Sequence, residues 1–161
     1  MEPDKLILTP MEEDLKQLAV QSLETLLQSL GFEGTVTPEE MDNIICLQIS
    51  SPDAKFLIGE DGDRLDDLQY LVNRMIQHKI PDAPRVKVDC DSYRQRHEKK
   101  LLDKALSIAE KVKETGKPMK LYPLNAYHRM LVHNALKEVP GIVTESEEGN
   151  ARFKRITIRP E

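Results

Sequence analysis

Apolar residues recur along the chain with two different periods. Spacings of three and four, which are typical of one face of a helix, run through residues 11–30, through Leu65 to Ile76, and from Asp91, the expected N-cap, to Thr115. The same spacing marks a short helical turn at 53–58 and a helix from about Asn125 to Lys137. Five helical segments are therefore expected.

Strand-forming residues fill the stretches between these helices. Residues 32–37 and 43–50 predict a hairpin around a polar turn at 38–42, and residues 85–90 predict a third strand. Two more strands are expected at 142–145 and 152–159, joined by the polar segment 146–150. The chain is therefore expected to be α+β, with one domain at 1–90, which includes an N-terminal tail, and a second at 91–161, which includes the connecting helix.

Composition and charge bear on the kind of partner. An apolar fraction of 39% and a charged fraction of 32% are typical of a folded globular protein, and 161 residues are too few for a large multidomain enzyme. Residues 1–90 carry 8 basic and 18 acidic residues, a net charge of −10, whereas residues 91–161 carry 15 and 10, a net charge of +5. Because a polyanion needs a local excess of cations, the second half is the better candidate for binding nucleic acid.

Several classes of function lack a sequence signal. No stretch has the roughly 20 apolar residues that cross a bilayer, and the N-terminus does not resemble a signal peptide, so a cytoplasmic protein without membrane insertion is expected. Cys46 and Cys90 lie in strand-like runs and are expected to be small buried hydrophobes. The sequence has no zinc-site spacing and no GxSxG, HExxH or P-loop motif, so we expect no metal, no cofactor and no catalytic residue.

Two glycines, Gly59 and Gly62, stand three residues apart between two predicted helices. Without a Cβ they let a sugar-phosphate backbone approach closely, and the helix that follows offers partial positive charge. KH modules use such a GxxG loop to clamp about four nucleotides. The plainer alternative is a turn that joins two packed helices.

Arg129 and His133 lie four residues apart on a predicted helix and therefore share one face, which Lys137 extends. The final basic strand adds Arg152, Lys154, Arg155 and Arg159, interleaved with Phe153. These cations could contact phosphates while Phe153 stacks on a base. Alternatively, Phe153, Ile156 and Ile158 pack the core and the cations form an ordinary polar surface.

The segments FLIGEDGDRLDDLQYLVNRM and VDCDSYRQRHEKKL resemble the KH core and the following junction of the bacterial Jag/KhpB family, with Asp89, Tyr93, Arg94 and Arg96 in the junction pattern. LNAYHRMLVHNALKEVPGIVTESEEGNARFKRITI is similar to the domain named for its Arg-x-x-x-His signature. The resemblance implies a type II KH-like domain (αββααβ), joined by a long helix to a small α/β domain of the Arg-x-x-x-His type. It further implies a single-stranded RNA-binding protein that acts as a post-transcriptional or cell-envelope-linked regulator, with Arg129 and His133 in its binding site.

The resemblance leaves alternatives open. Single-stranded DNA is a second possible ligand, and a KH-domain partner protein or a homodimer is a possible partner. The loop of this chain holds Glu60 and Asp61 where family members generally have a basic residue, so we expect a weak or silent RNA site there, or a protein-interaction scaffold with a degenerate KH site. The chain starts almost directly at the first helix, so the additional N-terminal domain of the family is expected to be missing.

Overall fold

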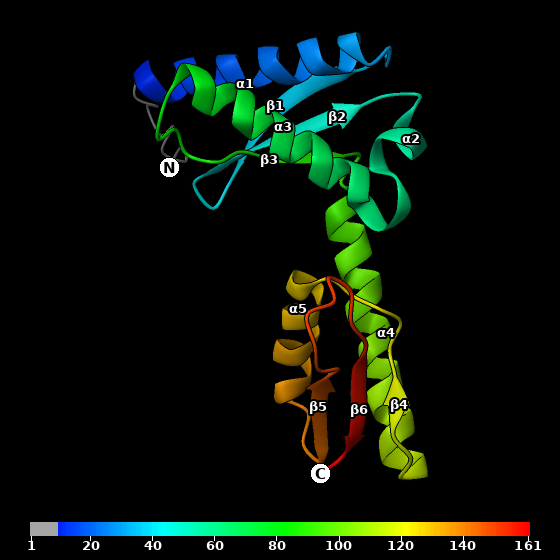
Figure 1. Ribbon diagram of the computed structural model, residues 1–161. Coiled ribbons are helices and arrows are strands. Elements are labelled where there is room, and N and C mark those ends of the chain that lie inside the picture. The colour runs from blue at the N-terminus through cyan, green and yellow to red at the C-terminus, as the bar shows by residue number, and fades with distance from the viewer. Residues whose placement is uncertain (1–9) are drawn as a thin grey trace, which may run out of the picture. The chain divides into compact units, whose positions relative to one another are not determined.

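A computed structural model describes residues 10–161; the expected N-terminal tail, residues 1–9, lies outside the described residues. The chain divides into two compact units, one ending at Arg94 and the other running from Gln95 to Glu161. Each unit combines helices with a small three-stranded sheet (Figure 1), which confirms the α+β class. No helix within residues 10–161 is long and apolar enough to span a membrane.

The first unit has the element order that the sequence predicts. It consists of α1 (Pro10–Ser29), β1 (Thr35–Met41), β2 (Ile44–Ser50), α2 (Ala54–Ile58), the 3₁₀ turn η1 (Glu60–Gly62), α3 (Asp63–Lys79) and β3 (Lys87–Cys90). The strand order is β1-β2-β3, with β1 and β2 antiparallel and β2 and β3 parallel. Helices α1 and α3 pack together and contribute Leu23, Leu27, Leu65 and Ile76 to the core against Leu47 and Ile49 of β2.

The hairpin between β1 and β2 turns at a different place from the one predicted. The turn consists of Asp42 and Asn43, whose φ angles of 52° and 61° are those of a tight two-residue turn. Pro38, predicted to begin the turn, lies inside β1 opposite Leu47. Proline is tolerated there because β1 is an edge strand, on which a missing N–H can face solvent.

Side chains of α3 hydrogen-bond the backbone of the chain around β3. The amide of Asn73 donates to the carbonyl of Val86 (2.8 Å), and its oxygen accepts from Val86 N–H (2.8 Å). The N–H of Val88, two residues after Val86, donates to Gln69 Oε1 at 3.0 Å. Since β3 is an edge strand, these bonds replace those that another strand would make.

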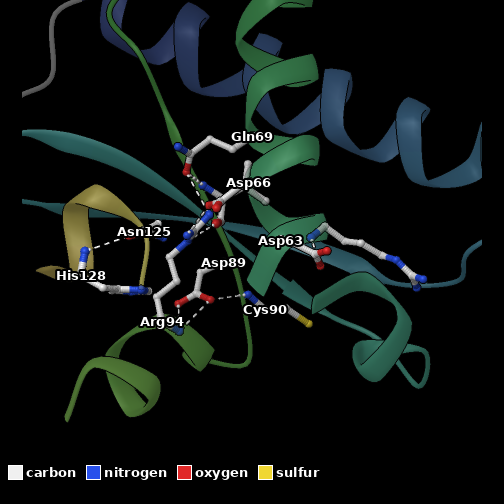
Figure 2. A network of polar contacts seen from close by, with 10 residues as sticks. Asp63, Asp66, Gln69, Asp89, Cys90, Arg94, Asn125 and His128 are labelled. Carbon is white, nitrogen blue, oxygen red and sulfur yellow. Dashed lines mark hydrogen bonds and ion pairs between the residues drawn. The ribbon is translucent and has the colours of Figure 1, made fainter. Parts of the chain in front are cut away.

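The junction between β3 and α4 (Tyr93–Thr115) is organised by Asp89 and Arg94. The Asp89 carboxylate, only 5% exposed, accepts from the backbone N–H groups of Cys90 (2.8 Å) and Arg94 (3.2 Å). The Arg94 guanidinium donates to Val88 O at 2.9 Å. It also pairs with Asp66 at 2.8 Å (Figure 2). Asp89 therefore accepts hydrogen bonds at the start of α4. Asp91, predicted as the N-cap, lies two residues before Tyr93, the first residue of the helix, and has a φ of 49°.

The second unit contains most of α4, followed by β4 (Met119–Lys120), α5 (Ala126–Lys137), β5 (Ile142–Ser146) and β6 (Ile156–Pro160). Strand β6 is central, with β4 and β5 antiparallel on either side. The core draws on α4, α5 and the sheet: Leu101, Ala105, Val112, Val132, Leu136, Ile156 and Ile158.

The last strand is shorter than the predicted 152–159. Ile156 and Ile158 alternate toward the core and are fully buried, whereas Phe153 is 49% exposed. Residues 152–155 have no apolar side chain in the core, so this segment runs as a loop. It is held by the bridge between Leu124 and Lys154 and by a hydrogen bond from Glu147 N–H to Arg155 O at 3.0 Å.

Cys46 and Cys90 are buried and are not joined by a disulfide, as predicted for small hydrophobic side chains. Burial, followed by the negative charge of Asp89, raises the pKa of the Cys46 thiol. Because the thiolate is the reactive form, this environment keeps Cys46 unreactive.

Replacing Asp89 with Ala should lower the free energy of unfolding by about 1 to 3 kcal/mol, since it removes the cap of α4 and leaves backbone donors without an acceptor. Urea denaturation of the variant and the wild type measures the difference. Asp67→Ala, at an exposed position on α3, is the matched control and should change stability by less than about 0.5 kcal/mol. Equal stability of the two variants would contradict the capping role.

Candidate nucleic-acid interface

Helix α5 positions Arg129 and His133. The helix begins at the N-cap Asn125, whose side chain accepts from His128 N–H at 2.8 Å (Figure 2). Val132 and Leu136 are buried four residues apart and hold one side of α5 against the core. At the predicted spacing of four, Arg129 and His133 flank this apolar row and are half-buried.

Arg129 is part of a backbone connection as well as a source of charge. Its Nη1 donates to the carbonyl of Leu124 at 2.8 Å. Leu124 in turn exchanges two backbone hydrogen bonds with Lys154, at 2.8 and 3.0 Å. Arg129 therefore connects the start of α5, through Leu124, to the loop at residues 150–155 that precedes β6.

His133 bonds to β5 through both ring nitrogens. Nδ1 lies 2.7 Å from the hydroxyl of Thr144, and Nε2 lies 2.8 Å from the hydroxyl of Ser146. Burial, followed by the positive charge of Arg129, lowers the pKa of His133, so the neutral ring predominates at pH 7. His133 thus holds α5 and β5 together rather than presenting a second positive charge.

Lys137 is exposed and is the last residue of α5. Eight residues separate it from Arg129, which corresponds to about 12 Å along a helix axis. The fold therefore brings Arg129 and His133 together and leaves Lys137 at the other end of the helix.

The basic loop consists of residues 150–155. Its cations Arg152 and Arg155 are exposed, and Lys154 is half-buried. The backbone N–H of Arg155 donates to Glu147 at 3.1 Å, and Glu147 also pairs with Lys120 at 3.5 Å. The bonds at Lys154 and Arg155 fix the backbone of the loop while the side chains of Arg152 and Arg155 extend from it.

One cation of the predicted patch is neutralised within the fold. Arg159 pairs with Glu145 across β5 and β6, with Nη2 at 2.6 Å from the carboxylate. The hydrogen bond from Arg159, together with its charge, lowers the pKa of Glu145. Arg159 is therefore a poor candidate for a phosphate contact.

Gly59 and Gly62 belong to the first unit and form a separate candidate site. Gly59 has φ 73°, and a Cβ there would lie 2.7 Å from Cγ of Arg64; Gly62 is buried with φ 82°, and its Cβ would lie 3.1 Å from the Tyr93 ring. Both positions therefore require glycine. The side chains between them, Glu60 and Asp61, are exposed, as expected for carboxylates that would face an approaching phosphate.

Three features of the second unit were not predicted from the sequence: the hydroxyl of Thr144, the hydroxyl of Ser146 and the Lys104–Tyr122 pair. Thr144 and Ser146 occupy alternate positions of β5, a spacing that places both hydroxyls on one face of the strand and could have identified them. Lys104 Nζ lies 4.8 Å from the centre of the Tyr122 ring. No local pattern reveals that pair, because its members lie on segments far apart in the sequence.

Comparison with known proteins identifies a domain within the second unit and relatives along most of the chain. The model of the R-3-H domain, the domain with the Arg-x-x-x-His signature, matches residues 99–160. An RNA-binding protein KhpB of Clostridium symbiosum is 32% identical over 155 residues, which cover 95% of this chain and 69% of that protein. Proteins of the same name from Bacillus subtilis (27% identical; 74% of this chain, 58% of the relative) and Streptococcus pneumoniae (23%; 83% and 42%) are also similar.

Burial and the charge of Arg129, which lower the pKa of His133, predict a pH dependence of folding. The unfolded chain takes up a proton at the ordinary pKa of about 6.5, whereas the folded chain does so only at lower pH. The contribution of His133 is therefore complete above pH 6.5 and decreases as the pH falls below it. NMR titration of the ring should give a pKa below 6.5, and His133→Gln should flatten the stability profile in this range; a pKa at or above 6.5 would contradict this.

Proposed function

This chain belongs to the KhpB family, and we propose that it binds single-stranded RNA through the basic surface of its second unit. One observation carries the proposal. Arg129 bonds to Leu124, and Leu124 bonds to Lys154, so the first turns of α5 lie beside the basic loop. The relatives are named as RNA-binding proteins, which supports RNA as the ligand.

Electrostatics favours a polyanionic ligand at this surface. Arg152 and Arg155 are exposed on a loop whose backbone is already held, so little conformational freedom is lost when they contact phosphates. Each contact releases counterions from the RNA, which supplies affinity without base recognition. His133 contributes by holding β5 against α5, and Lys137 adds a separate cation at the far end of the helix.

We propose that the first unit is a type II KH-like domain. Its helix, strand, strand, helix, glycine turn, helix, strand order and the parallel pairing of β2 with β3 support this assignment. Glu60 and Asp61 make its loop a weak RNA site, because they stand where a KH loop receives phosphates. We place the domain boundary near residue 90, at the end of β3 and shortly before the end of the first compact unit at Arg94.

The wider role follows from family membership. We place the protein in the cytoplasm as a post-transcriptional or cell-envelope-linked regulator, with a second KH-type protein or a second copy of this chain as a possible partner. A binding role rather than catalysis is supported at His133, because a threonine hydroxyl stands where a Ser-His-Asp triad has its carboxylate.

Arg152→Gln/Arg155→Gln should weaken binding of a labelled single-stranded RNA by about tenfold at low salt and reduce the slope of log K against log salt by about 0.7 for each lost phosphate contact. The backbone bond from Arg155 to Glu147 survives both substitutions. The matched control, Lys111→Gln/Lys113→Gln, removes the same charge from the end of α4 opposite the loop between β5 and β6 (Figure 1) and should bind like the wild type.

Three outcomes separate the candidate functions. Equal weakening by both pairs would mean that only net charge matters and would overturn the assignment of the site. A matched DNA strand that binds as tightly as RNA would favour a single-stranded DNA binder, because contacts to the 2′-hydroxyl distinguish the two. If wild-type protein shows no saturable binding, the protein is an interaction scaffold.

Glu60→Lys/Asp61→Lys should increase RNA affinity at low salt, with the gain disappearing at high salt. The expected gain rests on the exposure of residues 60 and 61, where a lysine side chain can reach an approaching phosphate. Glu24→Lys/Glu33→Lys, at exposed positions of the same unit, makes the same charge change and should give a smaller gain. No gain from the loop variant at any salt would mean that the loop does not clamp RNA.

A further inference from the structure

Phe153 is a large apolar side chain that the fold leaves at the surface. It is 49% exposed, although Ile156 and Ile158, close by in the same segment, are completely buried. The core of the second unit does not include Phe153, so the interpretation of this residue as a core side chain is wrong. Its exposure instead gives the cationic loop a flat apolar face.

A guanidinium already lies over this ring. The Arg152 guanidinium carbon is 5.4 Å from the centre of the Phe153 ring, within the range of a cation–π contact. An aromatic ring and a guanidinium are the two planar protein groups on which unpaired bases stack. Arg152 and Phe153 thus combine, in adjacent residues, a stacking surface with a positive charge.

The backbone on the C-terminal side of the ring is anchored. Lys154, the next residue, exchanges two hydrogen bonds with Leu124, and the N–H of Arg155 is held by Glu147. A ring on a fixed backbone loses less freedom when it contacts a ligand than one on a loose loop. Flanking cations, with Arg152 before the ring and Lys154 and Arg155 after it, suit a ligand whose flat apolar groups alternate with negative charges along a chain.

We propose that Phe153, with Arg152, stacks on one unpaired nucleobase while the flanking cations contact the neighbouring phosphates. This inference rests on the proposed RNA binding. It adds that the surface recognises an unstacked base of the RNA as well as its phosphate charge. The site therefore prefers single strands to duplexes, in which bases are already stacked, and tolerates different bases because each has a flat face.

The chain contains no tryptophan, so Phe153→Trp introduces a unique fluorophore at the site. A stacked base should quench this tryptophan, with a saturation curve that matches binding measured by anisotropy. Tyr70→Trp, at a 66% exposed aromatic position on α3, is the control and should show no saturable quenching. RNA binding by the Phe153→Trp variant without quenching of its tryptophan would overturn the proposal.

A second measurement isolates the base from the backbone. Phe153→Leu should weaken binding of an RNA oligonucleotide by about 5- to 30-fold and leave unchanged the affinity for an abasic ribose-phosphate chain of the same length. Arg152→Gln/Arg155→Gln should weaken both. If Phe153→Leu binds RNA like the wild type while the arginine variant is weakened, the stacking proposal fails and RNA binding stands; if wild-type protein binds neither ligand, the proposed function itself fails.

Discussion

The junction between β3 and α4 depends on two sets of interactions: the ion pair of Arg94 with Asp66 and the backbone hydrogen bonds accepted by Asp89. Arg94 joins the carbonyl of Val88 in β3 to the carboxylate of Asp66 in α3, and Asp89 accepts from the Arg94 N–H in the first turn of α4. The planar guanidinium of Arg94 suits this position better than a lysine ammonium would, because its N–H groups point in fixed directions toward Val88 O and Asp66. The helix that starts here supplies Leu101 and Val112 to the core of the second unit.

The sequence predicted element types well because periodicity is a local property. Helices and strands with a buried row of side chains were found at nearly their observed bounds. The turn at Asp42 and Asn43, the start of α4 and the end of the last loop were misplaced. In each case the deciding factor was a positive φ or a tertiary hydrogen bond, such as the acceptance of Arg94 N–H by Asp89, which composition and spacing do not reveal.

The same limit applies to the candidate site. A spacing of four correctly placed Arg129 and His133 on one side of α5, but their partners come from Leu124 and from β5. By charge count alone, Arg155 and Arg159 are equal candidates for phosphate contacts. In the structure, Glu145 on β5 pairs with Arg159 on β6 and neutralises it. Charge excess identifies the region that attracts a polyanion, and only the register of the strands tells which cations remain available.

The strand order of the second sheet has a consequence for synthesis of the protein. Strand β6 is central, yet it follows β4 and β5 in the chain. While a ribosome extends the chain from the N-terminus, β4 and β5 therefore have no partner until β6 emerges, whereas the sheet of the first unit is already complete. The link between Leu124 and Lys154 also closes only at this late stage, so a nascent chain gains its cationic surface last and carries its acidic unit folded ahead of it.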